Sequence, residues 1–181
     1  FRRVLFRSNM ADPLDIHQLQ RDANRGDPKA QFLLSQVLYR NNDLVGMVRW
    51  LMLASDSGLP VAREALGYCF EIGRGVRQDY EHAIELYDLA IDQDSARAAY
   101  RKAELLYKSR ASSSQLSSIA ALLKQSALQD FIPAWRTLGY LASHQQGTEE
   151  LARDCLSVAA QAGDITASFQ LGMLLRQEIG R

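Results

Sequence analysis

Four acidic side chains recur at a spacing that places them on one face of a helix. They are Glu81, Glu85, Asp88 and Asp92, at positions i, i+4, i+7 and i+11. Paired carboxylates can transfer protons as general acid and base, or bind a hard cation such as Ca²⁺. The opposite face of the same segment carries Ala83, Tyr87 and Ala90, which is the pattern of a helix packed on one side only. We therefore predict a solvated outer face there and no catalytic residues.

Glycines and histidines offer two further kinds of site. Gly73 and Gly75 enclose one residue, and such glycines can let backbone amides approach a phosphate. The segment has neither the preceding strand nor the lysine of a phosphate-binding loop, so we expect a turn with positive φ. Histidine occurs only at His17, His82 and His144, in separate segments without the spacing of metal ligands. The sequence therefore predicts no metal site, no cofactor and no small-molecule substrate.

Three basic side chains share one face of the segment that follows the acidic one. Arg97, Arg101 and Lys108 could contact RNA or an acidic peptide. Because neighbouring segments carry no matching basic stripe, we expect ion pairs with the acidic helix before them instead.

The two cysteines, Cys69 and Cys155, lie in different helical segments. Isolated cysteines within packed helices are typical of buried thiols and not of a disulfide framework. We therefore expect two structural thiols and a reducing, cytoplasmic location.

The balance of charge depends on the two ends of the chain. The 181 residues include 21 lysines and arginines and 21 aspartates and glutamates. Residues 2–8 and 179–181 resemble translated sequencing-adapter sequence, so we expect segments 1–9 and 179–181 to be artefactual and the natural chain to extend further. Without residues 1–8 and 179–181 the chain has 17 basic and 21 acidic side chains, a net charge of −4. A mildly acidic, Leu- and Ala-rich chain without an apolar run of transmembrane length argues against nucleic-acid and membrane binding.

Small residues recur along the chain at intervals typical of a helical repeat. Five alanines lie 32, 36, 36 and 33 residues apart, and each is followed five positions later by a small residue. The alanines are Ala30, Ala62, Ala98, Ala134 and Ala167, and the small residues are Ser35, Gly67, Ala103, Gly139 and Gly172. Small side chains at such positions let two helix axes approach closely, so the pattern predicts a first helix packed tightly against its neighbours.

A second helix follows each of the first four of these segments. Its apolar face has the spacing i, i+4, i+7, and the first residue of that face always precedes the next alanine by 15 residues. The faces are Met47, Leu51 and Ala54; Ala83, Tyr87 and Ala90; Ile119, Leu123 and Ser126; and Ala152, Leu156 and Ala159. Length variation is therefore expected in the loop between the two helices of a unit, including a serine-rich loop at 109–118.

Turn residues divide the chain into units. The units are about 27–58, 59–94, 95–130, 131–163 and a partial unit at 164–178, preceded by a capping helix or half repeat at 10–26. The residues between them are Gly26, Gly58, Asp94, Asp130 and Gly163. Asp27-Pro28 and Asp164 follow as helix-starting residues. We therefore expect one elongated array of about four and a half units.

The second unit resembles a known repeat. Its landmarks are Leu66-Gly67, Gly73-Arg74-Gly75-Val76, Asp79-Tyr80, Ala83, Leu86-Tyr87 and Ala90. They resemble the Sel-one-like repeat, a longer-looped relative of the tetratricopeptide repeat. The resemblance implies an all-α fold, namely a right-handed α-α superhelix (solenoid) of antiparallel helix pairs. It also implies that the fold scaffolds protein complexes, often in bacterial signalling or envelope regulation. It implies a fold and a style of binding, not a reaction.

Similarity to the tetratricopeptide repeat also places two positions of each first helix on the concave side. In this sequence they are Gln36 and Tyr39, Tyr68 and Glu71, Glu104 and Tyr107, Tyr140 and Ser143, and Met173 and Arg176. Tyrosine combines apolar area with a polar tip, which suits peptide recognition. We predict that a partner peptide or helix binds to the tyrosines, with charge preference set by Glu71, Glu104 and Arg176. The alternative is that some of these tyrosines pack between repeats.

The function predicted from the sequence is that of a protein-interaction scaffold or adaptor, not of an enzyme. The other possibility is that the array is the N-terminal regulatory or docking region of a larger enzyme, whose catalytic domain lies beyond residue 178.

Overall fold

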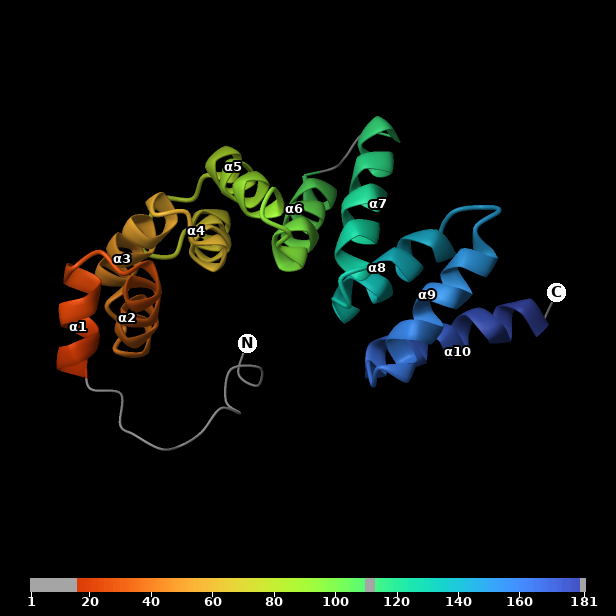
Figure 1. The fold of residues 1–181 in the computed structure, drawn as a ribbon. Coiled ribbons are helices and arrows are strands. Elements are labelled where there is room, and N and C mark those ends of the chain that lie inside the picture. Colours follow the sequence, from red (N-terminus) through yellow and green to blue (C-terminus); the bar gives the residue numbers. More distant parts are fainter. Residues whose placement is uncertain (1–15, 110–112, 180–181) are drawn as a thin grey trace.

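The computed structural model of the protein describes residues 16–109 and 113–179, which form ten α-helices and no strand (Figure 1). The helices are α1 (Ile16–Asn24), α2 (Pro28–Arg40), α3 (Leu44–Asp56), α4 (Pro60–Ile72), α5 (Tyr80–Ile91), α6 (Ala96–Lys108), α7 (Ser113–Ala127), α8 (Ile132–Ser143), α9 (Glu149–Gln161) and α10 (Ile165–Ile179). The predicted all-α superhelix of helix pairs is confirmed. The expected leader at 1–9 and residues 180–181 of the expected tail lie outside the described ranges.

Each helix packs against the helices before and after it. α2 packs against α3, α4 against α5, α6 against α7 and α8 against α9, and each pair stacks on the next. α1 packs on α2 at one end of the array, and α10 packs on α9 at the other. First helices also approach one another directly, since α4 touches α6 and α8 touches α10. The chain thus bends into an arch that has α2, α4 and α6 on its inner side (Figure 1).

Helices end at residues with a left-handed backbone, at the positions that the sequence places between units. Positive φ angles of 92°, 86°, 60°, 59° and 88° occur at Gly26, Gly58, Asp94, Asp130 and Gly163. Glycine adopts this conformation without steric cost, and aspartate tolerates it better than most side chains. Asp27 and Asp164 then cap the next helices, because their carboxylates accept hydrogen bonds from the backbone N–H groups of Lys29 (3.0 Å) and Ala167 (2.9 Å).

Small residues form the contact surfaces between helices. The buried alanines include Ala30, Ala62, Ala83, Ala90, Ala98, Ala134, Ala159 and Ala167. Gly67 and Gly139 permit closer contacts still, because a Cβ added there would lie 2.9 Å from Cε1 of Tyr87 and 2.8 Å from Cγ of Leu156. Gly172 occupies the same repeat position in α10, but a Cβ added to it would have no atom within 4 Å. No contact among the described residues therefore requires glycine at position 172.

The third unit differs from the expectation. The sequence predicts a loop at 109–118, but α7 begins at Ser113, so the prediction is wrong for residues 113–118. α7 has 15 residues, whereas α3, α5 and α9 have 13, 12 and 13. The extra length of this unit is thus partly helical. In unit two the extra residues do form a loop, at 73–79, in which Gly73 and Gly75 have the predicted positive φ.

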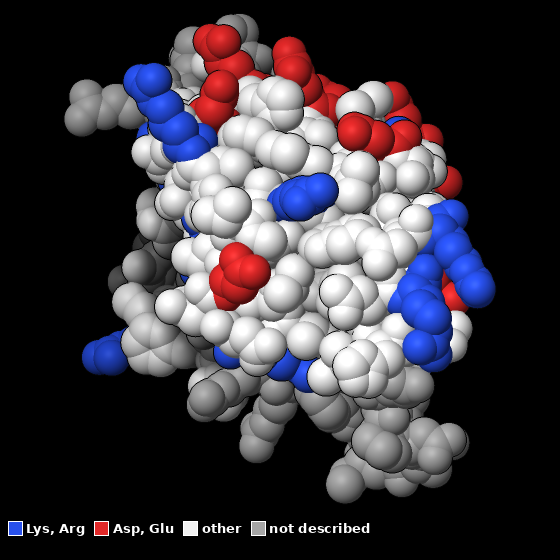
Figure 2. Space-filling view, turned by 90° about the vertical axis from the view of Figure 1, so that its left-hand side faces the viewer, with Lys and Arg blue, Asp and Glu red and all other residues white. Residues whose placement is uncertain are grey.

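At the end of the array where α1 lies, most charged side chains are found at the edges of the face (Figure 2). Acidic side chains gather along the upper edge of this face and basic side chains along the right-hand edge, and most of the area between them is uncharged. No helix in the described part of the chain combines the length and the apolar character needed to cross a membrane.

Candidate functional site

The acidic residues of α5 lie on its outer face. Glu81, Glu85 and Asp92 are exposed, and the carboxylate of Asp88 pairs with Nζ of Lys102. Within the described ranges, no group of three or more His, Cys, Asp or Glu side chains is placed to hold a metal ion. The stripe is therefore a solvated face with an ion pair to α6.

The basic side chains of α6 are engaged within the molecule. The ion pairs are Arg97–Glu64 at 3.4 Å, Arg101–Glu104 at 3.6 Å and Lys108–Glu71 at 3.8 Å. The predicted ion pairing is confirmed, but the predicted acceptor helix is wrong for these three. Glu64 and Glu71 belong to α4, and Glu104 belongs to α6 itself. Lys102 is the residue that reaches α5.

A pocket of about 240 Å³ opens between α2, α4 and α6. Its lining includes Phe32, Tyr39, Leu51, Tyr68, Arg74 and Arg101. An apolar cavity of roughly 150 Å³ is large enough to bind benzene. The pocket can therefore receive one large apolar side chain of a partner.

Two guanidinium groups stack on the tyrosine rings of this pocket. Cζ of Arg74 lies 5.3 Å from the ring centre of Tyr39 and 5.8 Å from that of Tyr68. Cζ of Arg101 lies 4.5 Å from the ring centre of Tyr68. Arg74 also donates a hydrogen bond to the hydroxyl of Tyr39, at 3.0 Å. These cation–π contacts orient both rings and thereby give the pocket a defined wall.

One carboxylate belongs to the same wall. Burial raises the pKa of Glu64, and the nearby charge of Arg97 and a hydrogen bond from the Ser95 hydroxyl oppose that shift. The hydroxyl donates to Oε2 of Glu64 at 3.2 Å, while Arg97 lies beside the other oxygen. Glu64 therefore has its hydrogen-bonding partners within the chain.

The predicted groove tyrosines do not all lie together. Tyr39, Tyr107 and Tyr140 have 43, 47 and 40% of their surface exposed, and Tyr68 is half-buried. Tyr39 and Tyr68 line the first pocket, whereas Tyr107 and Glu104 line a second hollow of about 170 Å³ between α6, α7 and α8. The structure thus brings two of the tyrosines into one pocket and leaves Tyr107 in a separate hollow farther along.

The remaining predicted groove residues lie toward the far end of the array. The ring of Tyr140 packs on that of His144, with 4.4 Å between ring centres. Arg176 is exposed on α10. Neither residue lines the two hollows described above.

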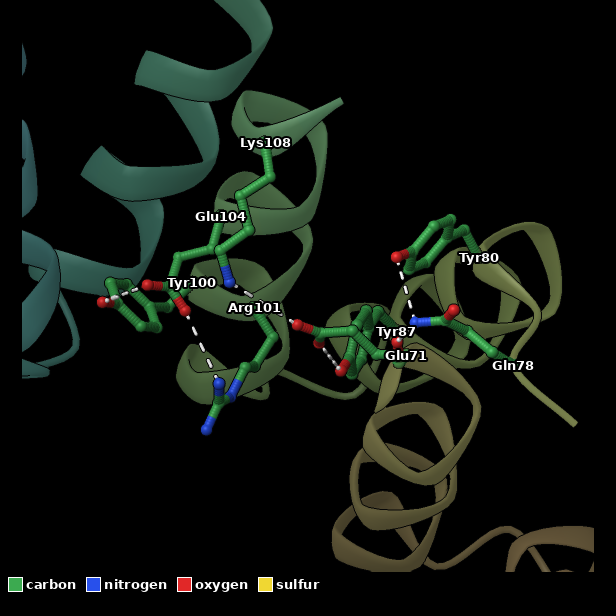
Figure 3. Close-up of polar contacts among 8 residues, drawn as sticks. All are labelled: Glu71, Gln78, Tyr80, Tyr87, Tyr100, Arg101, Glu104 and Lys108. Carbon is green, nitrogen blue, oxygen red and sulfur yellow. Dashed lines mark hydrogen bonds and ion pairs between the residues drawn. The ribbon is translucent and has the colours of Figure 1, made fainter. Parts of the chain in front are cut away.

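Glu71 does not lie on the open surface, which differs from its predicted place in the groove. It is 6% exposed, and Oε2 accepts a hydrogen bond from the hydroxyl of Tyr87 at 2.7 Å (Figure 3). The ammonium of Lys108 lies on the other oxygen, and the side-chain amide of Gln78 donates to the backbone carbonyl of Glu71 at 2.8 Å. Burial, followed by this hydrogen bond, raises the pKa of Tyr87, which keeps the phenol protonated. Glu71 therefore joins α4, α5 and α6 to one another.

Three features mark the segment from α4 to the end of α5. Gly67 makes a close helix contact, and Gly73 and Gly75 form a turn. Asp79 then caps α5, because its carboxylate accepts a hydrogen bond from the backbone N–H of His82 at 3.0 Å. Residues 60–95 match the Sel1 repeat. This is the family that the sequence of unit two resembles.

Solved structures extend the similarity over most of the chain. The crystal structure of c5321, a protective antigen of uropathogenic Escherichia coli with an SLR fold, has a TM-score of 0.81 and 21% identity over 90% of this chain and 36% of its own. A Sel1 repeat protein from Oxalobacter formigenes has a TM-score of 0.75 and 27% identity over 88% of this chain and 48% of its own. YrrB, described as a TPR protein with an unusual peptide-binding site, has a TM-score of 0.63 and 15% identity over 92% and 85%.

One curated relative is also similar in sequence. The chitin synthase regulator SKT5 of Saccharomyces cerevisiae is 30% identical over 91 residues, which are 47% of this chain and 13% of that protein. The chain thus spans a small part of SKT5 and less than half of c5321 and of the Oxalobacter protein. Taken together, the comparisons give the chain a Sel1- and TPR-like repeat fold, which commonly mediates protein–protein interaction.

Sequence reasoning missed the most distinctive residue of the first pocket. Arg74 lies in the Sel1 repeat loop, and the sequence presents it as part of a turn motif. The two positive-φ glycines on either side of it, Gly73 and Gly75, were the available signal, because such glycines allow a tight turn and, at Gly75, a close approach of the loop to α3.

Cys69 of the Sel1 repeat is predicted to react slowly. Both cysteines are free and buried, and burial raises the pKa of Cys69 from 9.0 to about 11. At pH 8 this shift lowers the thiolate fraction by roughly 100-fold. We expect iodoacetamide to alkylate Cys69 of a folded Cys155→Ala variant at least roughly 100-fold more slowly than in the same variant unfolded in urea. Similar rates in the two states would show that the thiol is not buried in solution.

Proposed function

We propose that the chain is a protein-interaction module whose inner face, built from the first helices α2, α4, α6, α8 and α10, binds a peptide or helical segment of a partner protein. The observation that carries this proposal is the pocket between α2, α4 and α6, where Tyr39 and Tyr68 are held by arginines. Tyrosine and arginine, together with tryptophan, are the side chains that most often dominate the energy of protein interfaces. The peptide-binding site named for YrrB supports the same use of this fold.

The proposed setting is the reducing cytoplasm. It is supported by two cysteines that are both free and both buried in separate helices. The proposal includes no cofactor, no nucleic acid and no membrane partner.

A second candidate is that the array serves as the N-terminal regulatory or docking region of a larger enzyme, whose catalytic domain follows the array. The observation in its favour is SKT5, a regulator of chitin synthase in which the matching segment is 13% of the length. Sequencing the genomic locus past the codon for Gln177 distinguishes the two: a following catalytic domain supports the docking region, and further repeats up to a stop codon support the stand-alone scaffold.

The inner-face proposal is tested by removing three tyrosines together. Random peptides displayed on phage are selected on the immobilised wild-type chain, and the affinities of the selected peptides are measured by fluorescence anisotropy. We expect the Tyr68→Ala, Tyr107→Ala, Tyr140→Ala triple variant to bind them at least tenfold more weakly, because buried aromatic anchors dominate such interfaces. The α-helical circular dichroism should be retained.

Tyr80 provides the matched control for these tyrosines. It is exposed, but it begins α5, a second helix, and it does not line either hollow. Tyr80→Ala should therefore leave peptide affinity unchanged. If the triple variant binds as well as wild type, or if Tyr80→Ala weakens binding to the same extent, the inner face is not the binding surface.

A further inference from the structure

The pocket between α2, α4 and α6 has more positive than negative charge. Its charged lining residues are Glu64, Arg74, Arg97 and Arg101. Arg97 pairs with Glu64, and Arg101 pairs with Glu104. In the part of the chain that the structure describes, no carboxylate is in ion-pair contact with Arg74. One guanidinium at the pocket is therefore left without a counter-charge from the chain itself.

Arg74 is held in place at the pocket. Its backbone N–H donates to the carbonyl of Cys69 at 2.8 Å, and the glycines on both sides have φ angles of 69° and 73°. Gly75 lies so close to α3 that an added Cβ would be 2.5 Å from the carbonyl oxygen of Leu44. The loop is thus packed on the preceding unit, and the guanidinium is presented without a large loss of entropy when a ligand binds.

The other partners of Arg74 are weak competitors for a carboxylate. The guanidinium meets two tyrosine rings and the neutral hydroxyl of Tyr39. A carboxylate forms shorter, charge-assisted and often bidentate hydrogen bonds with arginine. A partner carboxylate can therefore take up the remaining N–H donors of Arg74 while the tyrosine rings keep their stacking contacts.

We propose that this pocket binds an acidic peptide segment in which one large apolar side chain enters the cavity and a neighbouring aspartate or glutamate pairs with Arg74. The inference rests on the proposed function and specifies the chemistry of the partner. The volume of about 240 Å³ and the aromatic wall select the apolar anchor, and the uncompensated guanidinium selects the acid.

Charge also separates this partner from a nucleic acid. Nucleic-acid binding proteins neutralise several phosphates along the backbone and need a row of available cations. At this pocket two of the three arginines are already paired with Glu64 and Glu104, so one cation remains. A peptide that carries a single carboxylate next to its apolar side chain supplies one negative charge, which matches the one arginine that is not already paired.

The test uses the full chain and random dodecapeptides displayed on phage, followed by synthetic copies of the selected sequences. We expect the selected peptides to carry an aspartate or glutamate within two residues of Phe, Trp, Leu or Met. We expect Arg74→Gln to raise their Kd at least tenfold and Arg74→Lys to raise it less, because lysine keeps the charge but loses the bidentate geometry.

Arg77 supplies the matched control. It lies in the same loop, is exposed and does not line the pocket. Arg77→Gln removes the same charge from the chain and should change the Kd less than twofold. A charge swap completes the test, since Arg74→Glu should lose wild-type peptides and regain affinity for copies in which the acidic residue is replaced by lysine.

The outcomes separate this inference from the proposed function. If selected peptides bind in a manner sensitive to the three-tyrosine substitution but lack the acidic residue, or bind Arg74→Gln unchanged, the acidic-segment proposal is overturned and the inner-face proposal stands. Three other outcomes would also overturn the acidic-segment proposal. In the first, no peptide is selected, and in the second, a single-stranded oligonucleotide competes for the pocket more strongly than the acidic peptides. In the third, a second copy of the chain occupies the pocket in a dimer.

Discussion

Replacing Gly67 by leucine is expected to lower the free energy of unfolding by roughly 1 to 3 kcal/mol or more. Gly67 faces α5, where an added Cβ would lie 2.9 Å from Cε1 of Tyr87 and 3.3 Å from the backbone carbonyl of Ala83. Neither neighbour can move easily, because Tyr87 is fully buried and bonded to Glu71 and the carbonyl belongs to the helix backbone. The substitution must therefore push α4 and α5 apart.

Gly172→Leu is the matched control for this prediction. It makes the same change at the same repeat position, but a Cβ there would have no atom within 4 Å. Removing a helical glycine is itself favourable by up to about 1 kcal/mol, so this variant should be unchanged or slightly more stable. Urea unfolding followed by circular dichroism at 222 nm measures both variants. Equal midpoints for the two would show that α4 and α5 do not pack closely at Gly67 in solution.

The helical frame could be predicted because it follows from local, periodic requirements. Gly26, Gly58 and Gly163 recur where the backbone must turn left-handed, and the alanines recur where helix axes must approach. Positions that require glycine or alanine are easy to recognise in the sequence, since few other residue types can occupy a left-handed turn or a close helix contact. The helical start of α7 at Ser113 escaped prediction because serine is favoured both in turns and at the N-cap of a helix.

The binding surface was less predictable because it depends on which side chains meet across units. Tyr68 and Glu71 lie three residues apart on α4, yet one lines the pocket and the other is buried against α5 and α6. Arg74 joins the pocket because its loop folds back onto the preceding unit, where it reaches Tyr39. Such contacts link residues 35 positions apart, and the periodicity of a single helix contains no information about them.

The hydrogen bond between Tyr87 and Glu71 is also expected to contribute strongly to the free energy of unfolding. Tyr87→Phe leaves a buried carboxylate oxygen without its donor, which should cost about 1–3 kcal/mol. Glu71→Ala leaves the phenol and Lys108 unpaired and creates a cavity, which should cost about 3 kcal/mol. Since both variants lose the same bond, the double variant should cost less than the two single costs together, by about 1 kcal/mol or more. Strict additivity would mean that the bond contributes nothing.

Tyr100→Phe tests whether burial causes the effect. Its hydroxyl donates to Oε1 of Glu104 at 2.9 Å, a bond of the same chemical type, but the side chain of Glu104 is 26% exposed. Water can replace the lost donor there, so this variant should cost less than about 1 kcal/mol.

Alkaline pH provides an independent readout of the same bond. Burial raises the pKa of Tyr87 above the ordinary value of 10.0, so the folded chain retains a proton that the unfolded chain releases. The contribution of the protonated Tyr87 to the free energy of unfolding is therefore fully present below pH 10 and declines as the pH rises beyond it. Wild type should lose stability more steeply than Tyr87→Phe above that pH, because phenylalanine has no proton to release. Parallel losses in the two proteins would mean that Tyr87 ionises as readily folded as unfolded, and the bond that joins α4 to α5 would not have the buried character seen in the structure.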